Sequence, residues 1–180
     1  MDSENQQPHL IGGVEKRVID IVAYDPSWPE TYTRHNQMIS QALGKTALQI
    51  EHIGSTAVPQ LPAKPIIDIL VVVPDSAHEP AYLPALENAC YELRVREPDW
   101  HQHRMVRTPS KDVHIHVYSQ GCPEIERNLL FREWLRAHPD DRQLYAQTKQ
   151  SLAGRDWPDM NAYADAKTYV IERILSRARR

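Results

Sequence analysis

The sequence contains few of the residues that mark secreted, membrane-spanning or metal-scaffold proteins. Only two cysteines occur in 180 residues, Cys90 and Cys122, and their separation fits no metal or redox motif. Two isolated cysteines are typical of a reducing compartment, so we expect a cytoplasmic protein. No apolar run approaches the roughly 18 residues that span a membrane. The first thirteen residues, MDSENQQPHLIGG, lack the apolar segment of a signal peptide, so we expect none.

The chain also lacks an excess of positive charge. It has 21 Lys and Arg against 24 Asp and Glu, a net charge of −3. A broad nucleic-acid-binding face is usually basic, so this balance disfavours DNA or RNA as a partner. Basic residues do gather in one short segment, whose size suits the phosphates of a single nucleotide. They are Arg94, Arg96, Arg104, Arg107 and Lys111.

Glycine is scarce and proline is frequent, with 6 and 14 residues, which indicates stiff loops rather than flexible linkers. We expect a flexible arm over residues 1–16 and a single domain over residues 17–180. Hydrophobic periodicity and turn residues predict strands at 17–24, 47–53, 66–73, 91–95, 103–107 and 112–118. They predict helices at 26–44 and 80–90 and a helical last third, interrupted at 138–140 and ending in a helix over 159–176. Strands followed by helices indicate an α+β domain with a mixed sheet flanked by helices.

One carboxylate lies within the most apolar segment. Residues 66–73 read IIDILVVV, a run that predicts an interior strand. Burying an unpaired charge costs several kcal/mol, so Asp68 requires a partner, a metal ion or a cleft. An ion pair with Lys64 or an arginine would be a purely structural explanation. An isolated acid in an apolar strand is more typical of a functional site.

The segment Gly54-Ser55-Thr56 comes directly before the loop that leads to this strand. Glycine permits close approach of a ligand, and hydroxyl and backbone N–H groups can bind phosphate oxygens. The same residues are also common in ordinary turns. Lys64, in the following loop, can bind phosphate or pair with Asp68.

Residues 112–118, DVHIHVY, alternate between polar and apolar side chains. Asp112, His114, His116 and Tyr118 therefore share one face of the predicted strand. A solvated sheet face would show the same alternation. The functional interpretation is a cleft wall in which His114 or His116 binds a metal ion, a substrate or a proton.

Two further sets of residues have competing interpretations. Arg104 and Arg107 point to opposite faces of their strand, so we expect only one of them to face a cleft. The pairs Tyr145/Lys149 and Tyr163/Lys167 lie four residues apart on helices, a spacing that we interpret as solvated helix flanks.

The segment EHIGSTAVPQLPAKPIIDI, residues 51–69, resembles the signature of the GrpB family, whose members have a nucleotidyltransferase-like fold. The resemblance continues in HRMVR, HIHV and FREWLRAHP, in Tyr145 with Lys149, and in Tyr163 with Lys167. It covers most of the chain from about residue 17. The same domain occurs fused to dephospho-CoA kinase, which implies a nucleoside triphosphate or a CoA-related small molecule as partner.

The nucleotidyltransferase superfamily implies a Gly-Ser turn followed by two acids, two residues apart on the next strand, that bind two metal ions. Gly54-Ser55 resembles the turn and Asp68 the first acid. Leu70 stands at the position of the second acid, so the resemblance implies a reduced metal site. Its metal ligands would be Asp68 with Glu51, His114 or His116, and the ion Mg²⁺ or Mn²⁺. Gln60 stands where the family usually has glycine.

These observations imply a nucleotidyltransferase that acts on a small-molecule acceptor. Asp68 and His116 would be catalytic. The triphosphate would be bound by Gly54, Ser55, Thr56, Lys64 and Arg104. The alternative is a non-catalytic module of the same fold that binds a nucleotide or a CoA precursor. In either case we expect Ser55, Lys64, Asp68 and His116 to line one cleft.

Overall fold

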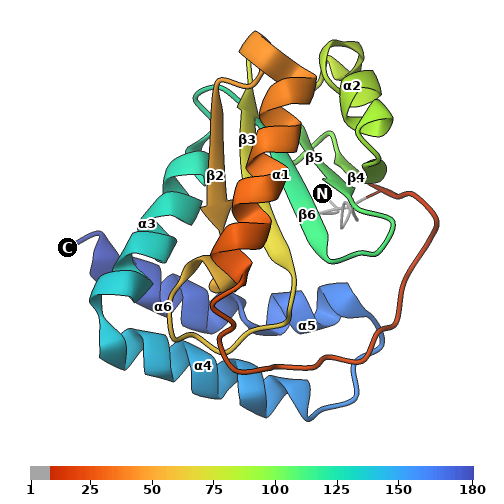
Figure 1. Ribbon diagram of the computed structural model, residues 1–180. Helices are drawn as coiled ribbons and strands as arrows, with labels where there is room; N and C mark the ends of the chain where they lie inside the picture. The colour runs from red at the N-terminus through yellow and green to blue at the C-terminus, as the bar shows by residue number, and fades with distance from the viewer. Residues whose placement is uncertain (1–8) are drawn as a thin grey trace, which may run out of the picture.

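The computed structural model describes residues 9–180, and a six-stranded sheet lies at their centre (Figure 1). The strands are β1 (His9–Leu10), β2 (Gln49–Ile53), β3 (Ile67–Val73), β4 (Glu92–Glu97), β5 (His103–Arg107) and β6 (Val113–Ser119). Their order in the sheet is β1-β4-β5-β6-β3-β2. β3 and β6 are parallel and the other neighbours are antiparallel, so the sheet is mixed. The predicted interior position of β3 is confirmed.

Helices surround this sheet and fill the last third of the chain. They are α1 (Trp28–Leu43), α2 (Leu83–Asn88), α3 (Pro123–Ala137), α4 (Pro139–Ala153), α5 (Met160–Ala166) and α6 (Thr168–Ala178). Short 3₁₀ turns occur at Gly44–Thr46, Ser55–Ala57 and Glu79–Ala81. The predicted α+β class is therefore confirmed. The Gly54-Ser55 turn follows β2, Asp68 lies on β3, and β6 runs parallel beside β3.

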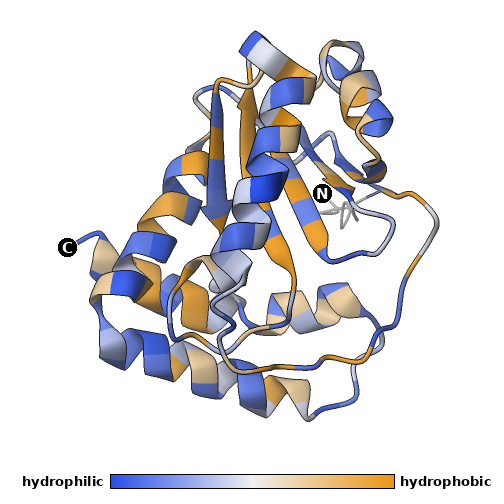
Figure 2. Cartoon of the chain, in the orientation of Figure 1, coloured by the Kyte–Doolittle hydropathy of each residue, from blue (hydrophilic) through white to orange (hydrophobic). Residues whose placement is uncertain are grey.

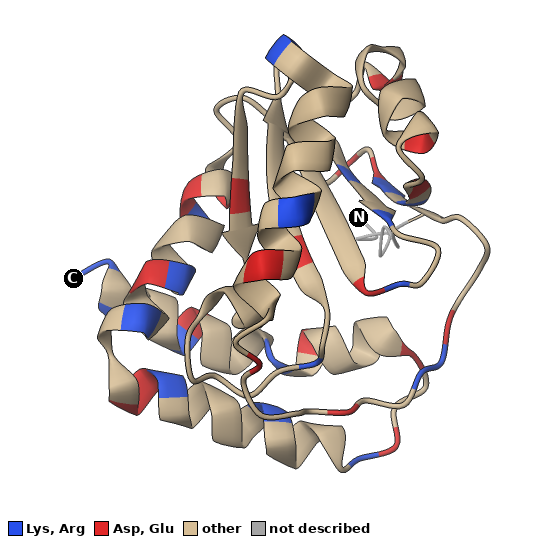
Figure 3. Ribbon diagram, in the orientation of Figure 1, with Lys and Arg blue, Asp and Glu red and all other residues tan. Residues whose placement is uncertain are grey.

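The two faces of β3 pack against different helices. Ile67, Ile69 and Val71 belong to a core that α1 and α2 cover. On the opposite face Leu70 and Val72 pack beneath α3. Figure 2 shows this division, with hydrophobic colour on the central strands and mixed colours on the helices. Charged residues lie mainly on the helices, the connecting segments and the strands β4 and β5, whereas β3 and β6 carry few (Figure 3).

Two sequence-based expectations about local structure are wrong. Residues 17–24 form no strand; Val22 and Ala63 make a single isolated bridge and Val18 is exposed. The segment has the composition of a strand, but it pairs with a neighbouring segment at one residue only, which is too little to form a ladder. The final helix is divided at Lys167 into α5 and α6.

The expected arm over residues 1–16 stays a prediction. Residues 1–8 lie outside the described part of the chain. In the remainder, β1 pairs with β4, and Glu15 forms an ion pair with Arg107. This stretch is therefore anchored to the sheet. Among residues 9–180, none of the helices has the length and apolar character needed to cross a membrane.

Candidate active site

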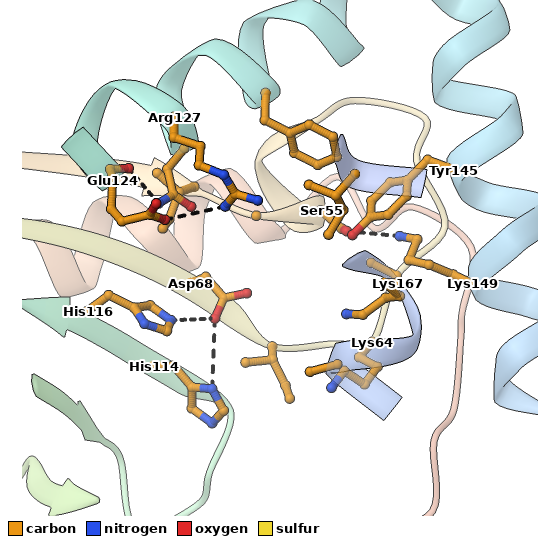
Figure 4. Close-up of a pocket in the computed structure, with 18 of the residues that line it drawn as sticks. Ser55, Lys64, Asp68, His114, His116, Glu124, Arg127, Tyr145, Lys149 and Lys167 are labelled. Carbon is orange, nitrogen blue, oxygen red and sulfur yellow. Dashed lines mark hydrogen bonds and ion pairs between the residues drawn. The ribbon is translucent and has the colours of Figure 1, made fainter. Parts of the chain in front are cut away.

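A pocket of about 390 Å³ opens on the Asp68 face of the sheet. Its floor is β3 and β6, and its walls come from the turn after β2 and from α3, α4, α5 and α6. Figure 4 shows that side chains from these distant segments converge on it. Ser55, Lys64, Asp68 and His116 all line the pocket, so the predicted cleft is confirmed.

Strand pairing places Asp68 and the two histidines side by side. Asp68 is the register partner of His114 in the parallel pair β3–β6, and His116 lies two residues further on the same face. The Nε2 atom of His116 lies 3.2 Å from Oδ1 of Asp68, and Nδ1 of His114 lies 3.8 Å from the same oxygen. One ligand atom from each residue lies within 4.8 Å of the others. The three side chains therefore form a compact set of metal-ligand types.

The electrostatics of this set keep the ligands in forms that can bind a cation. Burial acts to raise the pKa of the Asp68 carboxyl, but the hydrogen bond and charge of His116 outweigh it, so the pKa is lowered. Burial lowers the pKa of His114 to about 4. His114 is therefore neutral at pH 7, the form in which imidazole binds a metal ion.

Gly54 is required by its contact with Asp68. Its φ of 72° lies in the region that favours glycine. A Cβ atom at this position would lie only 2.7 Å from Oδ2 of Asp68. Any larger residue would displace the Asp68 carboxylate, so the position of the acid depends on glycine in the turn.

Three lysines gather at the other end of the pocket. Lys149 is 2% exposed and donates hydrogen bonds to Oγ of Ser55 at 2.9 Å and to the carbonyl of Pro62 at 2.5 Å. The Nζ atoms of Lys64 and Lys167 lie 5.2 and 4.7 Å from the centre of the Tyr163 ring. These cation–π contacts and the shared pocket hold three positive charges close together.

Burial and mutual repulsion shift these lysines. Burial, followed by the charge of Lys167, lowers the pKa of Lys64 to about 8. Burial and the charges of Lys167 and Lys64 lower the pKa of Lys149 to about 7. A polyanion bound among them would offset both effects, so this end of the pocket is suited to phosphate groups.

Two of the expected site residues have other contacts. The Thr56 hydroxyl is buried, 3.0 Å from Nε2 of His52, and donates to the carbonyl of Ile66. It braces the loop and does not line the pocket. Glu51 lies on the Asp68 face but accepts a hydrogen bond from Arg132 at 2.8 Å, outside the group of metal-ligand types.

The basic segment of residues 94–111 does not provide the phosphate site that we expected. Arg104 lies on the opposite face of the sheet, where its Nε donates to Glu79 at 2.6 Å. Arg107 shares the face of His114, but it is paired with Glu15 and Glu92. Arg94 donates to backbone carbonyls of the N-terminal segment, Arg96 pairs with Glu79, and Lys111 pairs with Glu15.

Sequence reasoning missed the residues from the C-terminal helices. Tyr145, Lys149 and Tyr163 are buried and line the pocket with Lys167, so their interpretation as solvated flanks is wrong. The repeated Tyr and Lys spacing in two helices was the available signal. On α3, Arg127 and Glu124 also line the pocket, with Nη1 of Arg127 3.3 Å from Oε2 of Glu124.

Comparison with known proteins identifies the relatives of this chain. Residues 18–177 match the GrpB protein family. The chain belongs to the GrpB family. It is 53% identical over 169 residues to a UPF0157 protein of Streptomyces coelicolor. This match covers 94% of the chain and 89% of the relative.

The GrpB fold is also seen in a crystal structure of conserved protein GrpB from Enterococcus faecalis. That structure is 34% identical, has a TM-score of 0.78, and covers 88% of this chain and 96% of its own. A more distant relative is a dephospho-CoA kinase of Mycolicibacterium paratuberculosis, 31% identical over 182 residues. This match covers 86% of the GrpB chain but only 44% of the kinase.

Proposed function

We propose that this GrpB protein transfers a nucleotidyl group from a nucleoside triphosphate to a small acceptor. One observation carries the proposal: a single pocket places the carboxylate and imidazoles of Asp68, His114 and His116 beside a cluster of three lysines. The first group is suited to a divalent cation and the second to phosphates. A metal-bound triphosphate needs both, a few ångströms apart.

The pocket residues have distinct roles in this proposal. Ser55, at the Gly54 turn, would bind phosphate oxygens together with Lys64, Lys149 and Lys167. The Asp68 carboxylate, with His116 and His114, would bind a divalent ion, for which the sequence resemblance implied Mg²⁺ or Mn²⁺. Such an ion neutralises phosphate charge and orients the group that is transferred.

The proposed reaction is an in-line displacement at the α-phosphorus. The acceptor oxygen forms a bond to this phosphorus while the bond to the β-phosphate oxygen breaks, and pyrophosphate leaves. The lysine cluster stabilises the charge that develops on pyrophosphate. The Asp68 carboxylate is in place to take the proton of the acceptor hydroxyl, with the His116 ring 3.2 Å from its Oδ1 atom.

The alternative is a module that binds a nucleotide or a CoA precursor without turnover. Leu70 favours this possibility, because it occupies the position of the second acid and is fully buried beneath α3. It therefore offers no second carboxylate to the pocket. The dephospho-CoA kinase relative supports CoA precursors as candidate ligands.

A panel of nucleoside triphosphates and CoA precursors, with and without Mg²⁺ and Mn²⁺, tests both proposals. Thermal unfolding would report binding, because a ligand at 100 times its Kd stabilises by about 2.7 kcal/mol. Pyrophosphate release would report transfer. Metal-dependent binding with release supports the transferase, and binding without release supports the module. If the wild-type protein bound none of these ligands, both proposals would be contradicted.

A further inference from the structure

A chain of hydrogen bonds runs from β4 through two histidines to Asp68. Oε2 of Glu97 lies 2.5 Å from Nδ1 of His103. Nε2 of His103 lies 3.1 Å from Nδ1 of His116, and Nε2 of His116 lies 3.2 Å from Oδ1 of Asp68. The rings of His103 and His116 are stacked, with 5.3 Å between their centres. Neither Glu97 nor His103 lines the pocket, so both act from behind it.

The direction of the protons in this chain follows from Glu97. An ionised carboxylate only accepts hydrogen bonds, so Nδ1 of His103 carries the proton. When His103 is neutral, its Nε2 accepts a hydrogen bond and Nδ1 of His116 donates to it. The lone pair of His116 Nε2 then faces the Asp68 carboxylate. Two acceptors at 3.2 Å repel each other, so this contact requires either a proton or a metal ion between the two atoms, and a metal ion can replace the proton.

The second histidine, His114, also faces Asp68, but among the described residues it has no partner like His103 behind it. His114 Nδ1 is 3.8 Å from Oδ1 of Asp68, too far for a hydrogen bond. Its Nε2 atom is buried, and within residues 9–180 no hydrogen-bond partner reaches it. Two imidazole nitrogens therefore approach one carboxylate oxygen. This donor set differs from the all-oxygen set that Mg²⁺ prefers.

We propose that Glu97 and His103 are positioning residues that hold His116 as a metal ligand, and that the site selects a divalent transition-metal ion over Mg²⁺. This deepens the proposed function by naming the class of ion at the same site. Imidazole ligands suit Zn²⁺, Fe²⁺ and similar ions, whereas Mg²⁺ favours carboxylate and water. Glu97 accepts a hydrogen bond from His103, and His103 in turn accepts one from His116. A partner of this kind increases the basicity of the metal-ligating nitrogen of His116.

Metal binding alone tests the inference, without nucleotide. The full chain, stripped of metal with a chelator and dialysed, would be titrated with Co²⁺, Zn²⁺, Mn²⁺ and Mg²⁺. Co²⁺ binding is followed by its visible absorption, and the other ions by competition with Co²⁺. We expect Co²⁺ and Zn²⁺ to bind at least about 100-fold more tightly than Mg²⁺, with Mn²⁺ between them. Equal or tighter binding of Mg²⁺ would overturn the choice of ion.

Variants test the positioning role. Glu97→Gln should weaken Co²⁺ binding by about 10-fold to 100-fold and change its spectrum, because the amide no longer fixes the tautomer. Mg²⁺ affinity should change little. The matched control is Glu92→Gln, a change on the same strand at a residue that pairs with Arg107 away from the pocket. A Co²⁺ affinity within twofold of wild type in Glu97→Gln would refute the role of Glu97.

A second pair of variants protects the test against misfolding. If Glu97→Gln fails to fold, His103→Gln should give the same selective loss, and the control is His101→Gln, an exposed histidine in the adjoining loop. His116→Gln should abolish the Co²⁺ spectrum, and a retained spectrum would place the ion elsewhere. Transition-metal binding without any nucleotide binding would contradict the proposed function alone. Mg²⁺-dependent nucleotide binding and pyrophosphate release by a chain that does not bind Co²⁺ would contradict this inference alone.

Discussion

Replacing Lys149 by methionine should change stability in a direction that reverses with pH. The lysine is 2% exposed, and burial together with the charges of Lys167 and Lys64 lowers its pKa from 10.5 to about 7. Between these values the unfolded chain binds more protons than the folded one, so the stability of the wild type rises with pH. Methionine has a similar length and no charge, so it removes this dependence.

The magnitude follows from the two pKa values. One pKa unit corresponds to about 1.4 kcal/mol. At pH 7 the unfolded lysine is charged and the folded one is half charged, and this difference costs about 4 kcal/mol of stability. At pH 10 the same cost falls to about 1 kcal/mol. Loss of the hydrogen bonds to Ser55 and Pro62 opposes the gain by about 1–3 kcal/mol.

Lys149→Met should therefore be more stable than wild type by about 1–3 kcal/mol at pH 7 and slightly less stable at pH 10. Urea unfolding, followed by tryptophan fluorescence in phosphate-free buffers between pH 7 and pH 10, measures both. Lys45→Met, at an exposed lysine, is the matched control and should show no such change. A difference between Lys149→Met and wild type that stays constant with pH would refute the reasoning. So would a variant that is destabilised throughout.

Three further changes test other parts of the site. Gly54→Ala should destabilise the protein by about 2 kcal/mol or more and weaken Co²⁺ binding, because its Cβ would meet the Asp68 carboxylate at 2.7 Å. Urea unfolding measures the first effect and a Co²⁺ titration the second. If both values were unchanged, the requirement for glycine at this contact would be contradicted. Gln60→Gly should raise the free energy of unfolding by about 0.5–1 kcal/mol, since Gln60 has a φ of 66°. Gln60 also accepts a hydrogen bond from Arg142 at 3.3 Å, and a lower midpoint in urea would show that this bond outweighs the strain. Asp68→Asn should abolish metal-dependent stabilisation in thermal unfolding. The metal-free protein should lose only about 1 kcal/mol of stability, as expected for a partly exposed carboxylate whose partners are histidines. If the variant unfolded several degrees lower and kept its metal response, Asp68 would have a structural role.

Local patterns in the sequence were sufficient for the centre of the site. The apolar run of β3 required an interior strand, and alternation put Asp68 on the opposite face from Ile67 and Ile69. The same two-residue period put His114 and His116 on one face of β6. Gly54 was identifiable from its place in a Gly-Ser-Thr turn directly after a predicted strand, although its close contact with Asp68 is visible only in the structure. These properties depend on a few consecutive residues, which is why they could be predicted.

Alternation alone was insufficient for the arginines, because it states that two side chains diverge without stating which one faces a cleft. The pairing of β5 with β6 decided this, by placing Arg107 opposite His114 and Arg104 opposite Val117. Charge then settled the outcome. Glu79 and Glu15, far away in sequence, neutralise these two arginines and remove them from any phosphate site.

Local periodicity and backbone preference are enough to predict the α+β class, the interior strand with its single acid, the Gly-Ser turn and the histidine face. Only the tertiary structure decided what completes the site. Lys149 lies 94 residues from Ser55, and the packing of α4 against the turn brings them to 2.9 Å. Glu97 and His103 reach His116 only because β4, β5 and β6 are neighbours in the sheet. A helix or strand pattern shows which residues share a face, but the partner of that face depends on the packing of the whole chain.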